Sequence, residues 1–263
     1  MSRSVHEAAS GGFGTAAEEY ARARPDYPGE AVDRLAQELE IGRRCTVLDI
    51  GAGTGKLTRQ LAELGSWVLA VEPVEAMRRM FSASLPGVPM VAGVAEALPV
   101  RAGQFDAVVC GQAFHWFDGP RALTDIYRVL KPQGRLGLMW NVKDDSVGWV
   151  SLLDEILHPY KSRVPQETTG EWRLAFSATD LFGTLHQLRF QHSQELDADG
   201  LMERYASASY IAVLPEAERT QVLRRINELA RTHPDLAGRS TFSLPYVTEL
   251  YWCSRREPNS QEI

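Results

Sequence analysis

The fold is decided by one stretch of the chain, which reads Thr46-Val47-Leu48-Asp49-Ile50-Gly51-Ala52-Gly53-Thr54-Gly55-Lys56-Leu57. Residues 46–50 form a short apolar run, which predicts a buried strand. Residues 56–64 carry three leucines at helical spacing, and Gly65 marks the end of that helix. The stretch therefore predicts a strand, a glycine-rich turn and a helix in direct succession.

The alternation of strands and helices continues on both sides of this unit. We expect an earlier helix that starts at Pro28, later helices over residues 74–85 and 120–130, and strands over residues 67–72, 88–92, 105–111 and 135–140. Strands that alternate with helices pair in parallel, and helices then cover both faces of the sheet. The predicted fold class is α/β, a doubly wound, mostly parallel seven-stranded sheet of the Rossmann-like kind.

The regular alternation of strands and helices ends after Asn141, which suggests an addition to the sheet. Helices are predicted over residues 147–158, 198–208 and 215–231, and the last two strands over residues 186–193 and 246–254. The two helices between the last two strands form a candidate lid over the substrate. We therefore expect a flexible arm (1–14), a cofactor-binding part (15–145), a C-terminal part of the same domain (146–256) with a helical substrate cap (about 196–240), and a tail (257–263).

The glycine turn has the properties of a ligand-binding loop. Closely spaced glycines let a ligand approach the backbone, and the N-terminus of the following helix offers unpaired N–H groups. Glu72 comes at the end of the next strand, where an acidic side chain can accept hydrogen bonds from the hydroxyls of a ribose. Loop and acid together predict a cofactor that contains adenosine.

Two other nucleotide-binding motifs fit this loop less well. A phosphate-binding P-loop requires glycine at Ile50 and serine or threonine at Leu57. A nicotinamide fingerprint requires its third glycine at the position of Lys56, one residue later than Gly55. An NAD-dependent oxidoreductase therefore remains a weaker alternative.

The remaining pattern resembles class I S-adenosylmethionine-dependent methyltransferases. The glycine loop and Glu72 are similar to motif I and to the acidic position that follows it in that family. The resemblance extends in order through Gly93-Val94-Ala95-Glu96-Ala97-Leu98-Pro99, Phe105 to Phe117, and Arg128-Val129-Leu130-Lys131-Pro132-Gln133-Gly134, where Gln133 replaces a usual glycine. The segment from Tyr20 to Pro28 is similar to the ubiquinone-biosynthesis-like and trans-aconitate-methyltransferase-like branch.

The resemblance implies S-adenosyl-L-methionine as the cofactor and S-adenosyl-L-homocysteine as its product. It also implies that Tyr20 and Arg24 close over the methionyl end of the cofactor, and that Ala95 and Glu96 flank the adenine. Met77 is expected mainly in the core, with a possible edge contact to the adenine. The complete predicted cofactor set is Tyr20, Arg24, Asp49, Gly51, Gly53, Thr54, Gly55, Glu72, Pro73, Met77, Ala95, Glu96 and Gln112.

His115 is the candidate catalytic residue. It follows the fourth strand, at the rim of the expected crevice, where a histidine can take a proton from the attacking nucleophile. The alternative is that it only orients the substrate or walls the pocket. The flanking Phe114 and Trp116 are expected in the pocket wall, and the Tyr205–Tyr210 stretch is a candidate to face the substrate from the lid.

The composition argues against nucleic-acid, metal and membrane partners. A formal charge of −6 and a sequence pI near 5.6 disfavour a nucleic-acid partner, since a basic surface is expected there. The three cysteines have no metal-binding spacing, so no metal is expected. No apolar run approaches membrane-spanning length and no leader is visible, so we expect a cytoplasmic protein without a membrane partner, monomeric or homodimeric.

These features together predict methyl transfer to a small molecule, with oxygen as the preferred accepting atom. The loop after the fourth strand reads Cys110-Gly111-Gln112-Ala113, which does not look like the Asp/Asn-Pro-Pro-Tyr loop of enzymes that methylate amide or base nitrogens. No metal and no covalent intermediate are needed for direct in-line displacement. The alternative from another class is a non-catalytic protein that binds the cofactor as a sensor.

Overall fold

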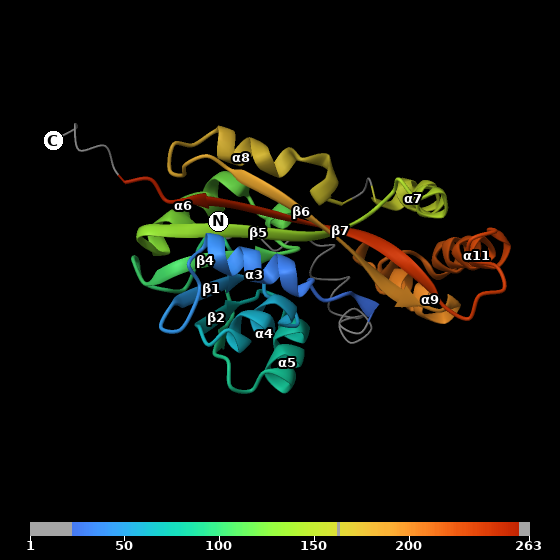
Figure 1. The fold of residues 1–263 in the computed structure, drawn as a ribbon, viewed down its shortest axis with the longest axis horizontal. Coiled ribbons are helices and arrows are strands. Elements are labelled where there is room, and N and C mark those ends of the chain that lie inside the picture. The colour runs from blue at the N-terminus through green and yellow to red at the C-terminus, as the bar shows by residue number, and fades with distance from the viewer. Residues whose placement is uncertain (1–22, 162–163, 258–263) are drawn as a thin grey trace.

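A seven-stranded sheet forms the centre of the computed structural model, which describes residues 23–161 and 164–257. Its strand order is β3-β2-β1-β4-β5-β7-β6, and β7 alone among these strands runs in the direction opposite to the other six (Figure 1). The strands are β1 (Thr46–Ile50), β2 (Trp67–Val71), β3 (Met90–Val91), β4 (Phe105–Gly111), β5 (Leu130–Lys143), β6 (His186–Leu196) and β7 (Phe242–Ser254). The predicted mostly parallel sheet is confirmed.

Helices cover both faces of the parallel strands. On one face α3 (Gly29–Glu38) and α4 (Lys56–Glu63) pack against Val47, Ala107 and Val109. On the other face α6 (Gly119–Val129) and α8 (Leu174–Ser177) pack over side chains of β1, β4 and β5. Alternate residues of β1 and β4 therefore point into two different cores, which is why these strands are apolar along most of their length.

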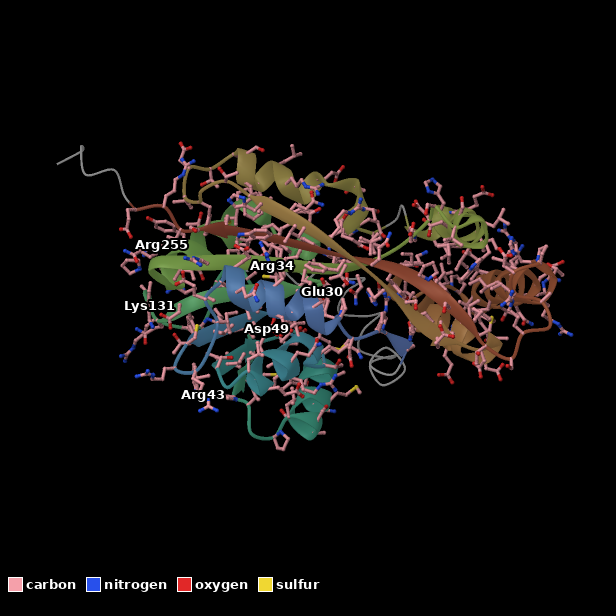
Figure 2. All side chains as sticks on the ribbon, in the orientation of Figure 1. Glu30, Arg34, Arg43, Asp49, Lys131 and Arg255 are labelled. Carbon is pink, nitrogen blue, oxygen red and sulfur yellow. The ribbon has the colours of Figure 1, made fainter. Side chains whose placement is uncertain are left out.

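Polar side chains fix the register of the central strands at the end of the sheet away from the glycine loop. The Asp106 carboxylate accepts hydrogen bonds from Lys131 Nζ at 2.8 Å and from the Thr46 backbone N–H at 2.9 Å. This network joins β1, β4 and the start of β5. Lys131 lies at this edge of the molecule in Figure 2, whereas Asp49 lies well inside it.

A separate helical module, defined here as α7, α9, α10 and α11, packs against the far ends of β6 and β7 (Figure 1). β6 and β7 are paired from His186↔Trp252 to Leu196↔Phe242, so this long ladder carries the module beyond the parallel sheet. The module has its own apolar core, to which Trp149, Leu201, Tyr205 and Val222 contribute. The four helices are α7 (Gly148–Lys161), α9 (Ala198–Ala206), α10 (Ser209–Ala212) and α11 (Glu216–Thr232).

Most predicted elements agree with the structure within a few residues, and the differences have physical causes. β5 extends over Leu130–Lys143 because it pairs with β7 up to Lys143↔Tyr246, and β7 itself begins at Phe242. The sequence did not predict the elements of only three or four residues, which are too short to show a periodic pattern: α8, α10 and the 3₁₀ turns η1 (Phe114–Trp116), η2 (Glu167–Thr169) and η3 (Glu171–Arg173). The helix α5 (Glu75–Ser84) follows β2 and agrees with the helix predicted over residues 74–85.

Gln133, which replaces a usual glycine, adopts a left-handed backbone with φ 64°. The predicted arm (1–14) and nearly all of the predicted tail (257–263) lie outside the described residues. Within the described residues, no helix combines the length and the apolarity that crossing a membrane requires.

Candidate active site

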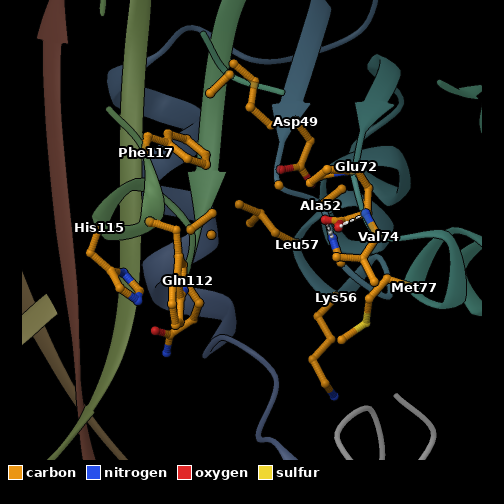
Figure 3. Close-up of a pocket in the computed structure, with 18 of the residues that line it drawn as sticks. Asp49, Ala52, Lys56, Leu57, Glu72, Val74, Met77, Gln112, His115 and Phe117 are labelled. Carbon is orange, nitrogen blue, oxygen red and sulfur yellow. Dashed lines mark hydrogen bonds between the residues drawn. The ribbon is translucent and has the colours of Figure 1, made fainter. Parts of the chain in front are cut away.

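A cavity of about 540 Å³ opens at the carboxyl ends of the parallel strands, where the loops after β1, β2, β3 and β4 meet (Figure 3). The structure brings the predicted site residues together there, with two exceptions. Gly55 does not line the cavity, and Tyr20 lies outside the described residues. The predicted residues that line it are Arg24, Asp49, Gly51, Gly53, Thr54, Glu72, Pro73, Met77, Ala95, Glu96, Gln112 and His115.

The three glycines of the loop have positive φ angles for different reasons. A Cβ at Gly51 would meet Ala113 Cβ at 2.6 Å, and a Cβ at Gly55 would meet Leu85 Cδ1 at 2.6 Å. These two glycines are therefore required by packing as well as by φ. A Cβ at Gly53 would meet nothing within 4 Å, although this residue has φ +58°. Gly53 is thus the glycine that leaves open space beside the backbone.

Glu72 faces this open space from the end of β2. Its Oε2 accepts a hydrogen bond from Gly53 N at 3.0 Å, and its Oε1 accepts one from Val74 N at 2.8 Å (Figure 3). Burial raises the pKa of the carboxyl, and the two backbone N–H groups and Arg78 oppose the rise. Each carboxylate oxygen has a further lone pair, so Glu72 can accept two more hydrogen bonds from a ligand.

Asp49 has an unusual environment at the end of β1. Its side chain is buried, its Oδ2 accepts a hydrogen bond from Thr58 Oγ1 at 2.5 Å, and its Oδ1 has no hydrogen-bond partner among the described residues. Burial raises the pKa of Asp49 to about 7, and repulsion from Glu72 adds to the rise against the Thr58 hydrogen bond. A buried oxygen without a partner is costly, so Oδ1 is available to a donor or cationic group of a ligand.

The raised pKa of Asp49 predicts how stability depends on pH. Asp49 binds a proton more tightly in the folded than in the unfolded chain, so its contribution to stability falls as pH rises from about 4 towards 7. We expect Asp49→Asn to gain stability relative to wild type as pH rises from 5 to 8, measured by urea unfolding. Asp106→Asn is the control. The pKa of Asp106 is lowered, because Lys131 and Thr46 outweigh burial, so the stability difference should stay constant over this range. If the difference in unfolding free energy between Asp49→Asn and wild type does not change with pH, the pKa of Asp49 is not raised.

His115 is held by a tryptophan from the neighbouring strand. Trp140 Nε1 donates a hydrogen bond to His115 Nδ1 at 3.0 Å, and His115 Nε2 lies 3.9 Å from Glu167 Oε2. The side chain is 8% exposed, and burial lowers its pKa, with Glu167 acting in the opposite direction. An indole N–H can only donate, so Nδ1 is the unprotonated nitrogen and Nε2 carries the proton of the neutral ring.

The rest of the loop after β4 is fixed by its own hydrogen bonds. Gln112 has a left-handed backbone with φ 55°, and its Nε2 donates to Asn141 O at 2.9 Å. Glu96 Oε1 accepts from Asp118 N at 2.7 Å, which ties the loop after β3 to the start of α6. Trp116 lines the cavity as expected. The prediction for Phe114 was wrong, since its ring is 1% exposed and packs among Phe117, Trp172 and Phe176.

A second cavity of about 110 Å³ adjoins the first and reaches the helical module. Tyr205, Ser209 and Tyr210 line it, so part of the Tyr205–Tyr210 stretch does face this space. Asn141 near the end of β5 and Arg204 in α9 also line the site, and the sequence did not indicate them because neither belongs to a recognisable motif. The residues common to both cavities are Arg24, Gln112, His115, Trp116, Asn141, Pro165 and Arg204.

The described residues fit an adenosine-containing cofactor on several structural grounds. Gly53 leaves room for close approach to the backbone, and Glu72 presents free lone pairs beside it. The unpartnered oxygen of Asp49 lies in the same cavity. Met77 and Ala95 are buried and add apolar wall, which suits a flat ring.

Comparisons with known proteins agree with this geometry. A methyltransferase domain model matches residues 48–138. The chain is 40% identical over 240 residues to an uncharacterized methyltransferase of Mycobacterium bovis, covering 90% of this chain and 92% of that protein. It is 36% identical over 247 residues to an uncharacterized methyltransferase-like protein of Schizosaccharomyces pombe, covering 94% and 96%. The solved structure of the YcgJ protein of Bacillus subtilis shares the fold, with a TM-score of 0.59 at 21% identity over 88% of this chain and 100% of that chain.

Proposed function

Because the chain belongs to the class I methyltransferase family, we propose that it transfers a methyl group from S-adenosylmethionine to an oxygen atom of a small molecule. When bound, the donor supplies a methyl group on a positively charged sulfur, which the acceptor displaces in line to leave S-adenosylhomocysteine. The observation that carries the proposal is the Glu72 carboxylate, which is held by the Gly53 and Val74 amides and faces the open side of the glycine loop.

The protein contributes mainly by binding and positioning. Glu72 accepts hydrogen bonds from the ribose hydroxyls, and Gly53 lets the donor lie against the loop backbone. Met77 and Ala95 enclose the adenine, and Arg24 reaches the methionyl end from the side of the second cavity. Holding acceptor, methyl and sulfur in line in a site with little water supplies most of the acceleration.

His115 acts in this proposal as a hydrogen-bond donor to the accepting oxygen. Its Nδ1 is occupied by the Trp140 indole N–H, so the neutral ring presents an N–H and no lone pair at Nε2. Taking a proton on Nδ1 would break the Trp140 hydrogen bond. The accepting oxygen therefore reaches the site already ionised, and proximity is sufficient for transfer. This role replaces general-base catalysis, the first of the two roles considered from sequence.

His115→Ala should lower kcat by about 10–100-fold, the value of one well-placed hydrogen bond, and leave affinity for S-adenosylhomocysteine unchanged. His115→Gln keeps an N–H donor and should retain much of the activity. The pH profile of kcat should have the same shape in wild type and in His115→Gln. If kcat falls at low pH in wild type but not in His115→Gln, His115 acts as a general base and the proposed donor role is wrong.

Oxygen is proposed as the accepting atom because the loop after β4 lacks the groups that serve nitrogen and carbon acceptors. Cys110 is buried inside β4 and Gly111 follows it, so this loop offers neither an amide-binding Asp/Asn-Pro-Pro-Tyr segment nor a cysteine nucleophile beside proline. An oxygen that is already ionised needs no base, so orientation by the His115 N–H is sufficient for it to accept the methyl group.

Calorimetry with S-adenosylhomocysteine and with NAD tests the choice of cofactor. We expect S-adenosylhomocysteine to bind with a micromolar or lower Kd, and NAD to show no binding at the same protein concentration. NAD binding without S-adenosylhomocysteine binding would overturn the proposal in favour of an oxidoreductase. Binding of S-adenosylhomocysteine without any turnover of the donor would indicate the non-catalytic sensor.

A further inference from the structure

Arg204 is a buried cation that no described carboxylate balances. The residue belongs to α9, is 4% exposed, and lines both cavities. Its Nε donates to Tyr246 Oη at 3.2 Å, and its guanidinium lies 5.5 Å from the centre of the Tyr205 ring. No carboxylate of a described residue lies within ion-pair distance of it. Burying a charge without a counter-ion is strongly unfavourable, so the Arg204 guanidinium is suited to binding an anionic group in the cavity.

The surroundings of Arg204 support the same conclusion. Tyr205 lines the second cavity, and its hydroxyl is buried with no hydrogen-bond partner among the described residues. Lys143 and Lys161 also line this cavity, and both donate to the single carboxylate of Asp154. The cavity is lined by four cationic side chains, those of Arg24, Lys143, Lys161 and Arg204, and by three carboxylates, those of Asp145, Asp154 and Glu167, so one positive charge is in excess.

We propose that Arg204 and the Tyr205 hydroxyl bind a carboxylate group of the methyl acceptor. The inference rests on the proposed function, because it identifies the acceptor's class within the same site. A guanidinium binds a carboxylate through two parallel N–H bonds, and the phenolic O–H adds a third donor. The acceptor is then an organic acid anchored in the second cavity, while its nucleophilic oxygen lies at the boundary with the first, beside His115.

The anchoring carboxylate and the methyl-accepting oxygen are different groups of one molecule. Ion pairing with Arg204 lowers the basicity of a carboxylate and makes it a poor nucleophile. A carboxylate also suits the site better than a phosphate dianion, because the lining side chains have one positive charge in excess and a second negative charge would have no counter-ion. The small volume of about 110 Å³ suits a carboxylate group, and the adjoining first cavity can hold more of the acid.

The test uses three simple acids and their neutral amides: formate, acetate and benzoate against formamide, acetamide and benzamide. Binding is followed by ligand-observed NMR, with and without saturating S-adenosylhomocysteine. We expect the acids and not the amides to bind to wild type, and Arg204→Met to weaken the acids at least about tenfold. Arg204→Lys keeps the charge without the planar fork and should be intermediate. Arg225→Met, an exposed arginine on α11, is the matched control and should bind as wild type does.

Calorimetry with S-adenosylhomocysteine on the same proteins separates this inference from the proposed function. We expect Arg204→Met to bind S-adenosylhomocysteine within about threefold of wild type. A large loss would mean that Arg204 holds the donor's own carboxylate, and would overturn the inference. Equal binding of acids and amides to wild type, or no binding of any acid, would overturn it as well. Neither result would affect the donor assignment, which fails only if wild type does not bind S-adenosylhomocysteine.

Discussion

Glu72→Ala should weaken binding of S-adenosylhomocysteine by about 100-fold or more. The side chain supplies charge-assisted hydrogen bonds to two ribose hydroxyls, each worth about 1.5–3 kcal/mol. Its removal also leaves the backbone N–H groups of Gly53 and Val74 without their acceptor, which loosens the loop that the donor contacts. The fold should survive, because no strand pairing depends on this side chain. Calorimetry measures the change.

Two further variants make the Glu72 experiment specific. Glu72→Gln keeps the shape and loses the charge, so its affinity should lie between wild type and Glu72→Ala. Glu75→Ala removes an exposed carboxylate from the next helix, where it pairs with Arg79, and should bind S-adenosylhomocysteine normally. Wild-type affinity in Glu72→Ala would remove Glu72 from the donor site.

Gly53→Val should also reduce donor affinity by about 100-fold or more, because its side chain would fill the space that the donor needs beside the loop. Part of the effect on stability comes from the backbone, since a β-branched residue at φ +58° is strained. Gly103→Val is a closely matched control: Gly103 has φ +64° and equally open surroundings, but it does not line the cavity.

The two glycine variants should therefore lose similar stability, measured by thermal unfolding, and differ in affinity for S-adenosylhomocysteine. Normal donor binding by Gly53→Val would mean that the loop is only a turn. A loss of affinity in both variants would mean that backbone strain, and not occupation of the donor space, explains the result.

The central part of the fold was predictable because its signals are local. The apolar run at residues 46–50, the three glycines and the helical spacing of the leucines that follow specify β1, the loop and α4 without reference to the rest of the chain. The acid at the end of the next strand then follows from topology, because parallel neighbours end at the same edge of the sheet.

The roles of single residues in the site depend on distant partners, and sequence reasoning could not supply them. Gly55 was expected to bind the cofactor, whereas its lack of a side chain makes room for Phe81 and Leu85. The proton position on His115 depends on Trp140, which the sequence shows only as an apolar residue near a strand end. The sequence does not show that Arg204 is buried or that no described carboxylate pairs with it.

The helical module was only partly predictable for a related reason. The helices over residues 198–208 and 215–231 were expected, but α7 was not recognised as part of the same module. Its packing against α10 and α11 depends on the long β6–β7 ladder, which carries these helices beyond the sheet. Long-range strand pairing of this kind leaves no short motif in the sequence.

Methyl transfer itself can be followed with a labelled donor. The protein is incubated with S-adenosylmethionine that carries a deuterated methyl group and with a small-molecule extract, and the products are identified by mass spectrometry. We expect one class of labelled product that retains all the deuterium of the methyl group, forms together with an equal amount of S-adenosylhomocysteine, and is strongly reduced with Glu72→Ala at the same donor concentration. Tight binding of the donor with no labelled product from any extract fraction would contradict methyl transfer.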